Sequence, residues 1–171
     1  MVSWPVADLV ALAADGSFRD ALSIAQKVML TIDGAEITDT DVVAPLIGAP
    51  QTRTVAELLA ALALGETKRG VDALTAARQE GADPNVLLRV LLERVRVVIL
   101  LRNAPESASP FLQGLQTDEQ VTLQEYAKAP ATRLTSHALR KLLAASGEMR
   151  FSPVPELPLE IAILEICQPS N

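Results

Sequence analysis

Apolar residues recur with helical spacing along almost the whole chain. No stretch alternates apolar and polar residues with the period of two that a half-buried strand requires, so the sequence predicts an all-α protein. Helices are expected at about 3–15, 17–33, 38–48, 54–64, 67–80, 83–102, 117–129, 132–146 and 156–167. Residues 103–110 are expected to form an exposed loop, and residues 151–155, which contain two prolines, an extended connection.

The helix at residues 83–102 organises the rest of the chain. Asp83 is suited to cap its N-terminus, and Pro84 supplies the φ angle of a first helical turn. Only Arg89, Glu93 and Arg96 form a polar ridge, and Arg89 and Glu93 are expected to pair at the i,i+4 spacing. The apolar positions are Val86, Leu87, Leu88, Val90, Leu91, Leu92, Val95, Val97, Val98, Ile99, Leu100 and Leu101.

These apolar positions cover far more than the stripe of roughly 100° on an ordinary surface helix. The helix is therefore either central within its own domain or covered on one flank by another chain. For the second case, the expected subunit interface consists of Arg89, Glu93, Val97 and Leu101.

Further helix signals predict where neighbouring helices start and which faces they bury. Ser17 is expected to cap the second helix, Thr38 and Asp41 to form a capping-box-like pair, and Thr117 and Gln120 a capping box. Gly147 is expected to end the helix at 132–146. The predicted buried side of the second helix is Phe18, Ala21, Leu22, Ile24, Ala25, Val28, Met29 and Leu30.

Composition excludes several classes of function. The chain has 171 residues, 49% of them hydrophobic and 21% charged, which is enough to bury a core. A net charge of -6 and scarce aromatic residues argue against a nucleic-acid-binding surface. A single cysteine, Cys167, precludes an intrachain disulfide, and no apolar window is long enough to span a membrane. A soluble, cytoplasmic protein is expected.

No residue is a good candidate for catalysis or metal binding. The glycines at 65 and 70 have the spacing of a phosphate-binding loop, but Val71 and Asp72 replace the required Lys and Ser/Thr. This segment is interpreted as a turn between helices. His137, the only histidine, is expected to be a half-exposed structural residue, and Cys167 to be packed in the last helix.

Arg19 is the one candidate for binding an anion. It lies in the first turn of the helix that Ser17 is expected to cap, where backbone N–H groups and a guanidinium together favour negative charge. On spacing alone, the alternative stays open that Arg19 pairs with a surface carboxylate and that Ser17 only caps the helix.

Four segments in order resemble the gamma/tau subunit of bacterial DNA polymerase III, the clamp-loader ATPase. Residues 16–23, Gly-Ser-Phe-Arg-Asp-Ala-Leu-Ser, resemble the lid segment of that family. Residues 37–48 resemble its "I-T-x-x-D-V…L-G" helix, and residues 81–84 with the Leu-rich helix after them its "G-x-D-P-x-x-L-L". Residues 157–164 resemble its final "L-P-L-E-L-A-L-L" helix. Residues 103–131 show no matching wording.

The resemblance implies a fold and a role. Residues 1–49 would be the C-terminal part of an AAA+ lid domain, and residues 50–171 a helical collar domain that joins subunits. Arg19 would be the sensor-2 residue, with Ser17 beside it, that reaches ATP phosphates held by a preceding domain. ATP and Mg²⁺ would belong to that domain, so the parent protein would be an ATPase and this chain alone inactive. Its partners would be gamma/tau, delta and delta-prime subunits, in an assembly that loads the sliding clamp on primed DNA.

Two other interpretations remain open. One is the oligomer-forming part of a related replication-fork maintenance ATPase, although such proteins usually carry Gly-Asp-x-Arg where this chain has Gly-Ser-Phe-Arg. The other is a free-standing helical adaptor that binds partner helices.

Overall fold

The computed structural model describes residues 3–31 and 37–168, and within these ranges the chain forms ten α-helices and no strand. The prediction of an all-α fold is confirmed. The helices are α1 (Trp4–Ala13), α2 (Phe18–Thr31), α3 (Thr40–Ile47), α4 (Thr52–Leu64), α5 (Thr67–Gln79), α6 (Pro84–Asn103), α7 (Pro105–Leu112), α8 (Thr117–Lys128), α9 (Ser136–Met149) and α10 (Leu157–Cys167).

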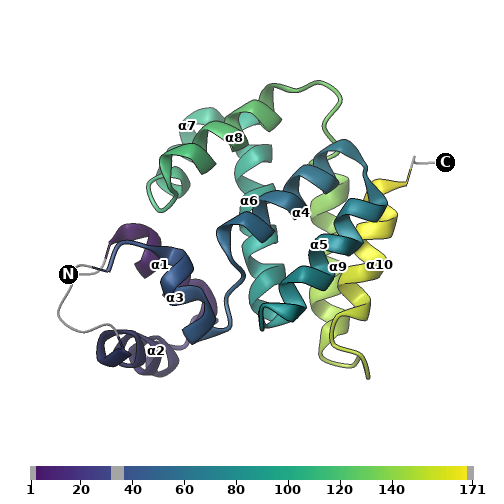
Figure 1. The fold of residues 1–171 in the computed structure, drawn as a ribbon. Coiled ribbons are helices and arrows are strands. Elements are labelled where there is room, and N and C mark those ends of the chain that lie inside the picture. The colour runs from purple at the N-terminus through teal and green to yellow at the C-terminus, as the bar shows by residue number, and fades with distance from the viewer. Residues whose placement is uncertain (1–2, 32–36, 169–171) are drawn as a thin grey trace.

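Helix α6 is the centre of the molecule (Figure 1). It packs against α9, α7, α8, α4 and α1, and Leu87, Leu88, Leu91 and Val95 are at most 1% exposed. The predicted cap is confirmed, because the Asp83 side chain accepts from the backbone N–H of Asn85 at the start of the helix. Of the two arrangements expected for this helix, the structure shows the central one.

The helices form two groups. One has a small hydrophobic core and the other a large one. Helices α1, α2 and α3 lie together at the N-terminal side of Figure 1, around a cluster formed by Val6, Val28, Ile37 and Val43. The remaining helices surround α6 and share one large core. Leu9 of α1 and Ala44 of α3 belong to this larger core, so the first group is packed onto the bundle.

One predicted loop is wrong. Residues expected to form an exposed loop include helix α7, which starts at Pro105 and buries Ala108 completely against the bundle. Proline is tolerated at a first helical position because its missing N–H has no intrahelical partner there. The helix signal at Pro105 was hidden by the serines and the second proline, Pro110, that follow it.

Several predicted helix ends also differ, among them the start expected at residue 132, because α9 begins at Ser136. Asp39, not Thr38, caps α3 and accepts from the N–H of Asp41. The predicted capping box of Thr117 is absent, because Thr117 is already the first helical residue and Gln116 precedes it. Gly147 does not end α9, which continues to Met149.

The predicted buried side of α2 is wrong at four of its eight positions, whereas Ala21, Ile24 and Ala25 are partly buried. Only Val28 is buried, whereas Phe18 is 84% exposed, Leu30 77%, Leu22 62% and Met29 57%. The expected end of this helix at residues 33–34 lies outside the described residues. Among the helices of the described part, none is long and apolar enough to cross a membrane.

Candidate functional site

The corner between α1 and α2 carries the predicted anion-binding residues. Asp15 (φ 52°) and Gly16 (φ 76°) turn the chain through two left-handed residues after α1. Ser17 then caps α2, since its Oγ accepts from the N–H of Asp20 at 3.2 Å. The predicted cap is therefore confirmed.

Arg19 projects from the first turn of α2 into solvent. Its side chain is exposed, and none of the ion pairs found in the described part of the chain involves it. An exposed guanidinium on the first turn of a helix, where backbone N–H groups lack intrahelical partners, suits phosphate oxygens. For Mg²⁺ the described residues offer no group of three His, Cys, Asp or Glu side chains.

The corner is attached to the central helix by Arg89. Its Nη1 donates to the carbonyl oxygens of Leu12, at 2.9 Å, and Ala13, at 3.4 Å, in the last turn of α1. Its Nη2 forms an ion pair with Asp15 at 2.9 Å. The expected pairing of Arg89 with Glu93 is wrong, because Glu93 faces Arg96 at 3.6 Å instead.

An apolar groove runs beside this corner. It has a volume of about 340 Å³ and lies between α1 and α2, with Val6 and Val10 on one side and Phe18, Leu22 and Val28 on the other. The exposed residues Phe18 and Leu22 thus border a continuous apolar surface next to Arg19.

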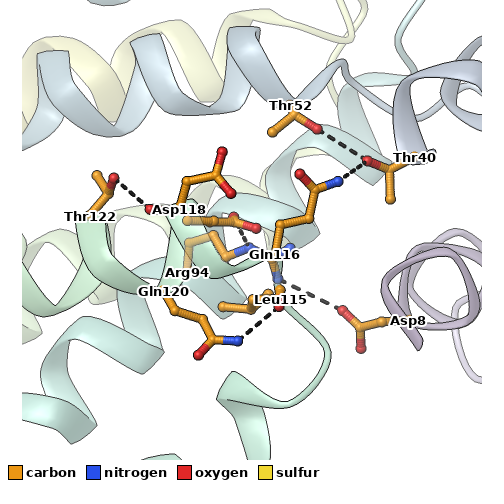
Figure 2. A network of polar contacts seen from close by, with 10 residues as sticks. Asp8, Thr40, Thr52, Arg94, Leu115, Gln116, Asp118, Gln120 and Thr122 are labelled. Carbon is orange, nitrogen blue, oxygen red and sulfur yellow. Dashed lines mark hydrogen bonds and ion pairs between the residues drawn. The ribbon is translucent and has the colours of Figure 1, made fainter. Parts of the chain in front are cut away.

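A polar network joins the first three helices to the bundle (Figure 2). Arg94 of α6, which is 9% exposed, donates from Nε to Glu119 of α8 at 2.7 Å. Its Nη1 lies 3.9 Å from Asp8 of α1. Burial raises the pKa of Asp8, and the nearby Arg94 only partly opposes this rise. One arginine therefore bridges carboxylates from two other helices.

A second row of contacts lies beside Arg94 in Figure 2. The amide nitrogen of Gln116 donates to Oγ1 of Thr40 at 3.1 Å, and that atom is 3.2 Å from Oγ1 of Thr52. The backbone N–H of Thr52 donates to Asp41 at 2.8 Å. The start of α3, the start of α4 and the start of α8 are thus linked by side chains.

The predicted interface residues lie on the side of α6 that faces α1 and α7. Glu93 and Val97 line a cleft of about 440 Å³ between these helices, but Val97 is only 1% exposed. Leu101 is half-buried against the core, and Arg89 is engaged with α1. The role of these four residues at a subunit interface stays a prediction.

Sequence reasoning missed a second apolar surface. Leu157, Ile161 and Leu164 of α10 are 40%, 43% and 37% exposed, and their spacing places them on one face of the helix. We call these three residues the α10 stripe. Leu143 of the neighbouring α9 is 54% exposed. The spacing was visible in the sequence, but nothing in it showed which face the bundle would leave uncovered.

The remaining candidates lie away from both regions. Cys167 is buried, as expected, and burial raises the pKa of its thiol. His137, expected to be half-exposed, is exposed on the first turn of α9. Gly65 ends α4 in a left-handed conformation and Gly70 lies inside α5, so only the first of the two glycines is part of the turn.

Comparison with known proteins points to one family. The model for "DNA polymerase III subunits gamma and tau domain III" matches residues 37–171. This match begins before α3, which the boundary expected at residues 49–50 would assign to the lid. The boundary stays a proposal.

Individual relatives agree with the family match. The DNA polymerase III subunit gamma/tau of Mycobacterium tuberculosis is 27% identical over 162 residues, which are 95% of this chain and 28% of that protein. The DNA polymerase III subunit tau of Bacillus subtilis is 26% identical over 165 residues, 96% of this chain and 28% of the relative. The chain thus spans little more than a quarter of the length of these relatives.

Proposed function

Because the chain belongs to the family of DNA polymerase III gamma and tau subunits, matched through their domain III, we propose that it is the lid end and collar of a clamp-loader subunit. The observation that carries this proposal is the family match over residues 37–171, together with an exposed Arg19 at the start of α2. The domains proposed are residues 1–49 for the lid part and 50–171 for the collar. The separate small core of α1 to α3 supports this division.

In the proposed mechanism, Arg19 senses the nucleotide. Its guanidinium and the first turn of α2, capped by Ser17, face phosphate groups bound by an ATP-binding domain of the same subunit. The apolar groove between α1 and α2 would receive part of that domain, because large exposed apolar surfaces mark sites of protein contact. ATP and Mg²⁺ are held outside this chain in this proposal.

The collar would assemble side by side with other subunits of the gamma/tau, delta and delta-prime types. The α10 stripe is proposed as the principal contact, since an apolar helix face that remains exposed in one chain is typical of the centre of an interface. The flank of α6 with Arg89, Glu93, Val97 and Leu101 remains a second candidate, which a partner would reach through the cleft beside α7. The assembled ring would load the sliding clamp on primed DNA at the expense of ATP.

The role of Arg19 can be tested in the gene product that contains this chain. We expect Arg19→Ala to lower ATP hydrolysis at least about tenfold, because a positioned cation that stabilises phosphate charge contributes at least that much. Arg150→Ala, at the exposed C-terminus of α9, is the matched control. Unchanged hydrolysis after Arg19→Ala would reject the sensing role.

The domains and the binding partners of the same gene product distinguish the proposed function from the two alternatives. A protein with no ATP-binding domain before this chain would favour the free-standing helical adaptor. A protein that hydrolyses ATP but does not associate with delta and delta-prime subunits would favour a related replication-fork ATPase.

A further inference from the structure

Arg89 is the only described side chain of α6 that hydrogen-bonds the last turn of α1. Two carbonyl oxygens there, of Leu12 and Ala13, accept from one nitrogen of its guanidinium, and the carboxylate of Asp15 pairs with the other. The Arg89 side chain is 27% exposed, so these contacts are partly shielded from water. A cation at a helix C-terminus is also favoured by the helix dipole.

The backbone next to these contacts is strained. Asp15 has a φ angle of 52°, which is uncommon for a residue other than glycine and costs free energy. The ion pair with Arg89 offsets that cost by holding the carboxylate of the strained residue. Asp15 in turn is only four residues from Arg19, and the N–H of Ser17 donates back to Ala14 at 2.9 Å.

We propose that Arg89 is a positioning residue for Arg19, fixing the corner between α1 and α2 to the central helix of the bundle. This inference rests on the nucleotide-sensing role proposed above for Arg19. Through these contacts the position of the corner that leads into α2 is coupled to α6 and to the helices packed around it.

The chemistry requires arginine at this position. The planar guanidinium presents separate N–H groups to the carbonyls and to the carboxylate at once, whereas the single ammonium of lysine has no such fork. The variant Arg89→Lys keeps the positive charge but loses the guanidinium fork. It therefore shows how much of the effect is due to charge alone.

The test is amide hydrogen exchange in the 171-residue chain, followed by NMR at Ala14 and Ser17, whose N–H groups bond within the corner. We expect Arg89→Met to speed exchange about tenfold or more, because hydrogen bonds to charged groups contribute that much to local stability. In Arg89→Lys, the exchange rate at these two residues should lie between the rates in Arg89→Met and in the unchanged chain. Exchange at Leu62 and Leu91, in the large core, should not change.

Two further variants make the test decisive. Arg102→Met, near the other end of α6, is the matched control and should leave the corner unchanged. Asp15→Asn removes only an exposed charge, so it will fold even if Arg89→Met does not, and should speed exchange at Ser17 severalfold. Exchange within twofold of the unchanged chain in both Arg89→Met and Asp15→Asn overturns the proposal.

Failure of the positioning role and failure of the proposed function give different results. If Arg89→Met frees the corner but Arg19→Ala leaves ATP hydrolysis intact in the whole gene product, the sensing role fails and the attachment of the corner stands. If Arg19→Ala abolishes hydrolysis while Arg89→Met changes neither exchange nor hydrolysis, the positioning role is wrong.

Discussion

At the scale of single residues, Arg94 holds the N-terminal helices on the bundle. It is buried and lies between Glu119, at 2.7 Å, and Asp8, at 3.9 Å. The free energy of an ion pair in the interior is small, but removal of one partner leaves the other charges uncompensated. The cost of losing Arg94 therefore exceeds that of losing a surface arginine.

We predict that Arg94→Met lowers the free energy of unfolding by about 3 kcal/mol at pH 7. The pKa of Asp8 already lies above its ordinary value, so the folded state binds this proton more tightly than the unfolded state. Stability from such a group is present at low pH and lost as pH rises through its pKa. Without Arg94 this effect grows, so the deficit should be smaller at pH 4.5 than at pH 7.

Urea denaturation at both pH values measures this deficit. The control is Arg96→Met, whose half-exposed side chain lies 3.6 Å from Glu93 on the same helix and 4.5 Å from the centre of the Phe111 ring, and which should cost less than about 1 kcal/mol. Equal losses of unfolding free energy in the two variants would show that Arg94 does not stabilise the packing of α1 and α8 on α6.

Cys167 offers a second measurement at this scale. It is 4% exposed, and burial raises the pKa of its thiol, which lowers the amount of reactive thiolate at pH 8. We predict that iodoacetamide alkylates it only as fast as the chain unfolds. Rapid alkylation of the folded chain, at a rate near that in urea, would contradict the packing of α10.

At the scale of helices, two glycines inside helices are predicted to respond in opposite directions to alanine. A Cβ at Gly70 of α5 would lie 2.7 Å from Cγ2 of Ile163, a fully buried residue of α10. A Cβ at Gly147 of α9 would meet no atom within 4 Å. Close packing of α5 on α10 thus explains a glycine where helix propensity favours alanine.

Gly147→Ala should raise the free energy of unfolding by about 0.5 kcal/mol, through helix propensity alone. Gly70→Ala should lower it by about 1–3 kcal/mol because the added methyl overfills the core. Thermal unfolding followed by circular dichroism measures both. Stabilisation by Gly70→Ala would mean that α5 and α10 are farther apart than described.

The exposed face of α2 gives a further prediction at this scale. Leu22 and Leu30 are 62% and 77% exposed, so Leu22→Gln and Leu30→Gln should each change the free energy of unfolding by less than about 0.5 kcal/mol. A loss above about 2 kcal/mol in the isolated chain would show that this face is buried in solution.

The positions of the helices along the chain could be predicted from the sequence more readily than which of their faces are buried. Apolar periodicity and the caps Asp83 and Ser17 placed most helices, because these signals are local. The prediction failed for α7, because Pro110 and the serines around it are typical of a loop, whereas the helix packs on the bundle through the buried Ala108. Periodicity also marked the apolar face of α2, but it cannot distinguish a face covered by the same chain from one left exposed.

The contacts of the candidate site depended on long-range packing. Arg19 was identified from the sequence of residues 16–23, but the carbonyl groups that accept from Arg89 are 76 and 77 residues away in the sequence. The same holds for Arg94, whose carboxylate partner Glu119 is on α8. These residues come together only because α1 and α8 pack on α6. Sequence spacing does not predict contacts between segments so far apart in the chain.

At the scale of the whole molecule, the described residues leave an apolar face exposed on α10 of the bundle and another on α2 of the N-terminal helices. In Figure 1, α10, which carries the α10 stripe, forms one edge of the bundle, and α2, which carries Arg19, lies at the opposite end of the molecule. In the proposed assembly, the face on α2 meets an ATP-binding domain and the α10 stripe meets a neighbouring collar. Substitutions at the two faces should therefore affect association differently.

The most direct test of this account is light scattering after size-exclusion chromatography, over a range of concentrations, for the chain alone and mixed with delta and delta-prime subunits. We expect a mass above that of the monomer, which falls to the monomer mass in Ile161→Glu and Leu164→Glu and is unaffected by Leu22→Glu. A monomer at every concentration and in every mixture, or association lost through Leu22→Glu and retained in both α10 variants, would contradict it.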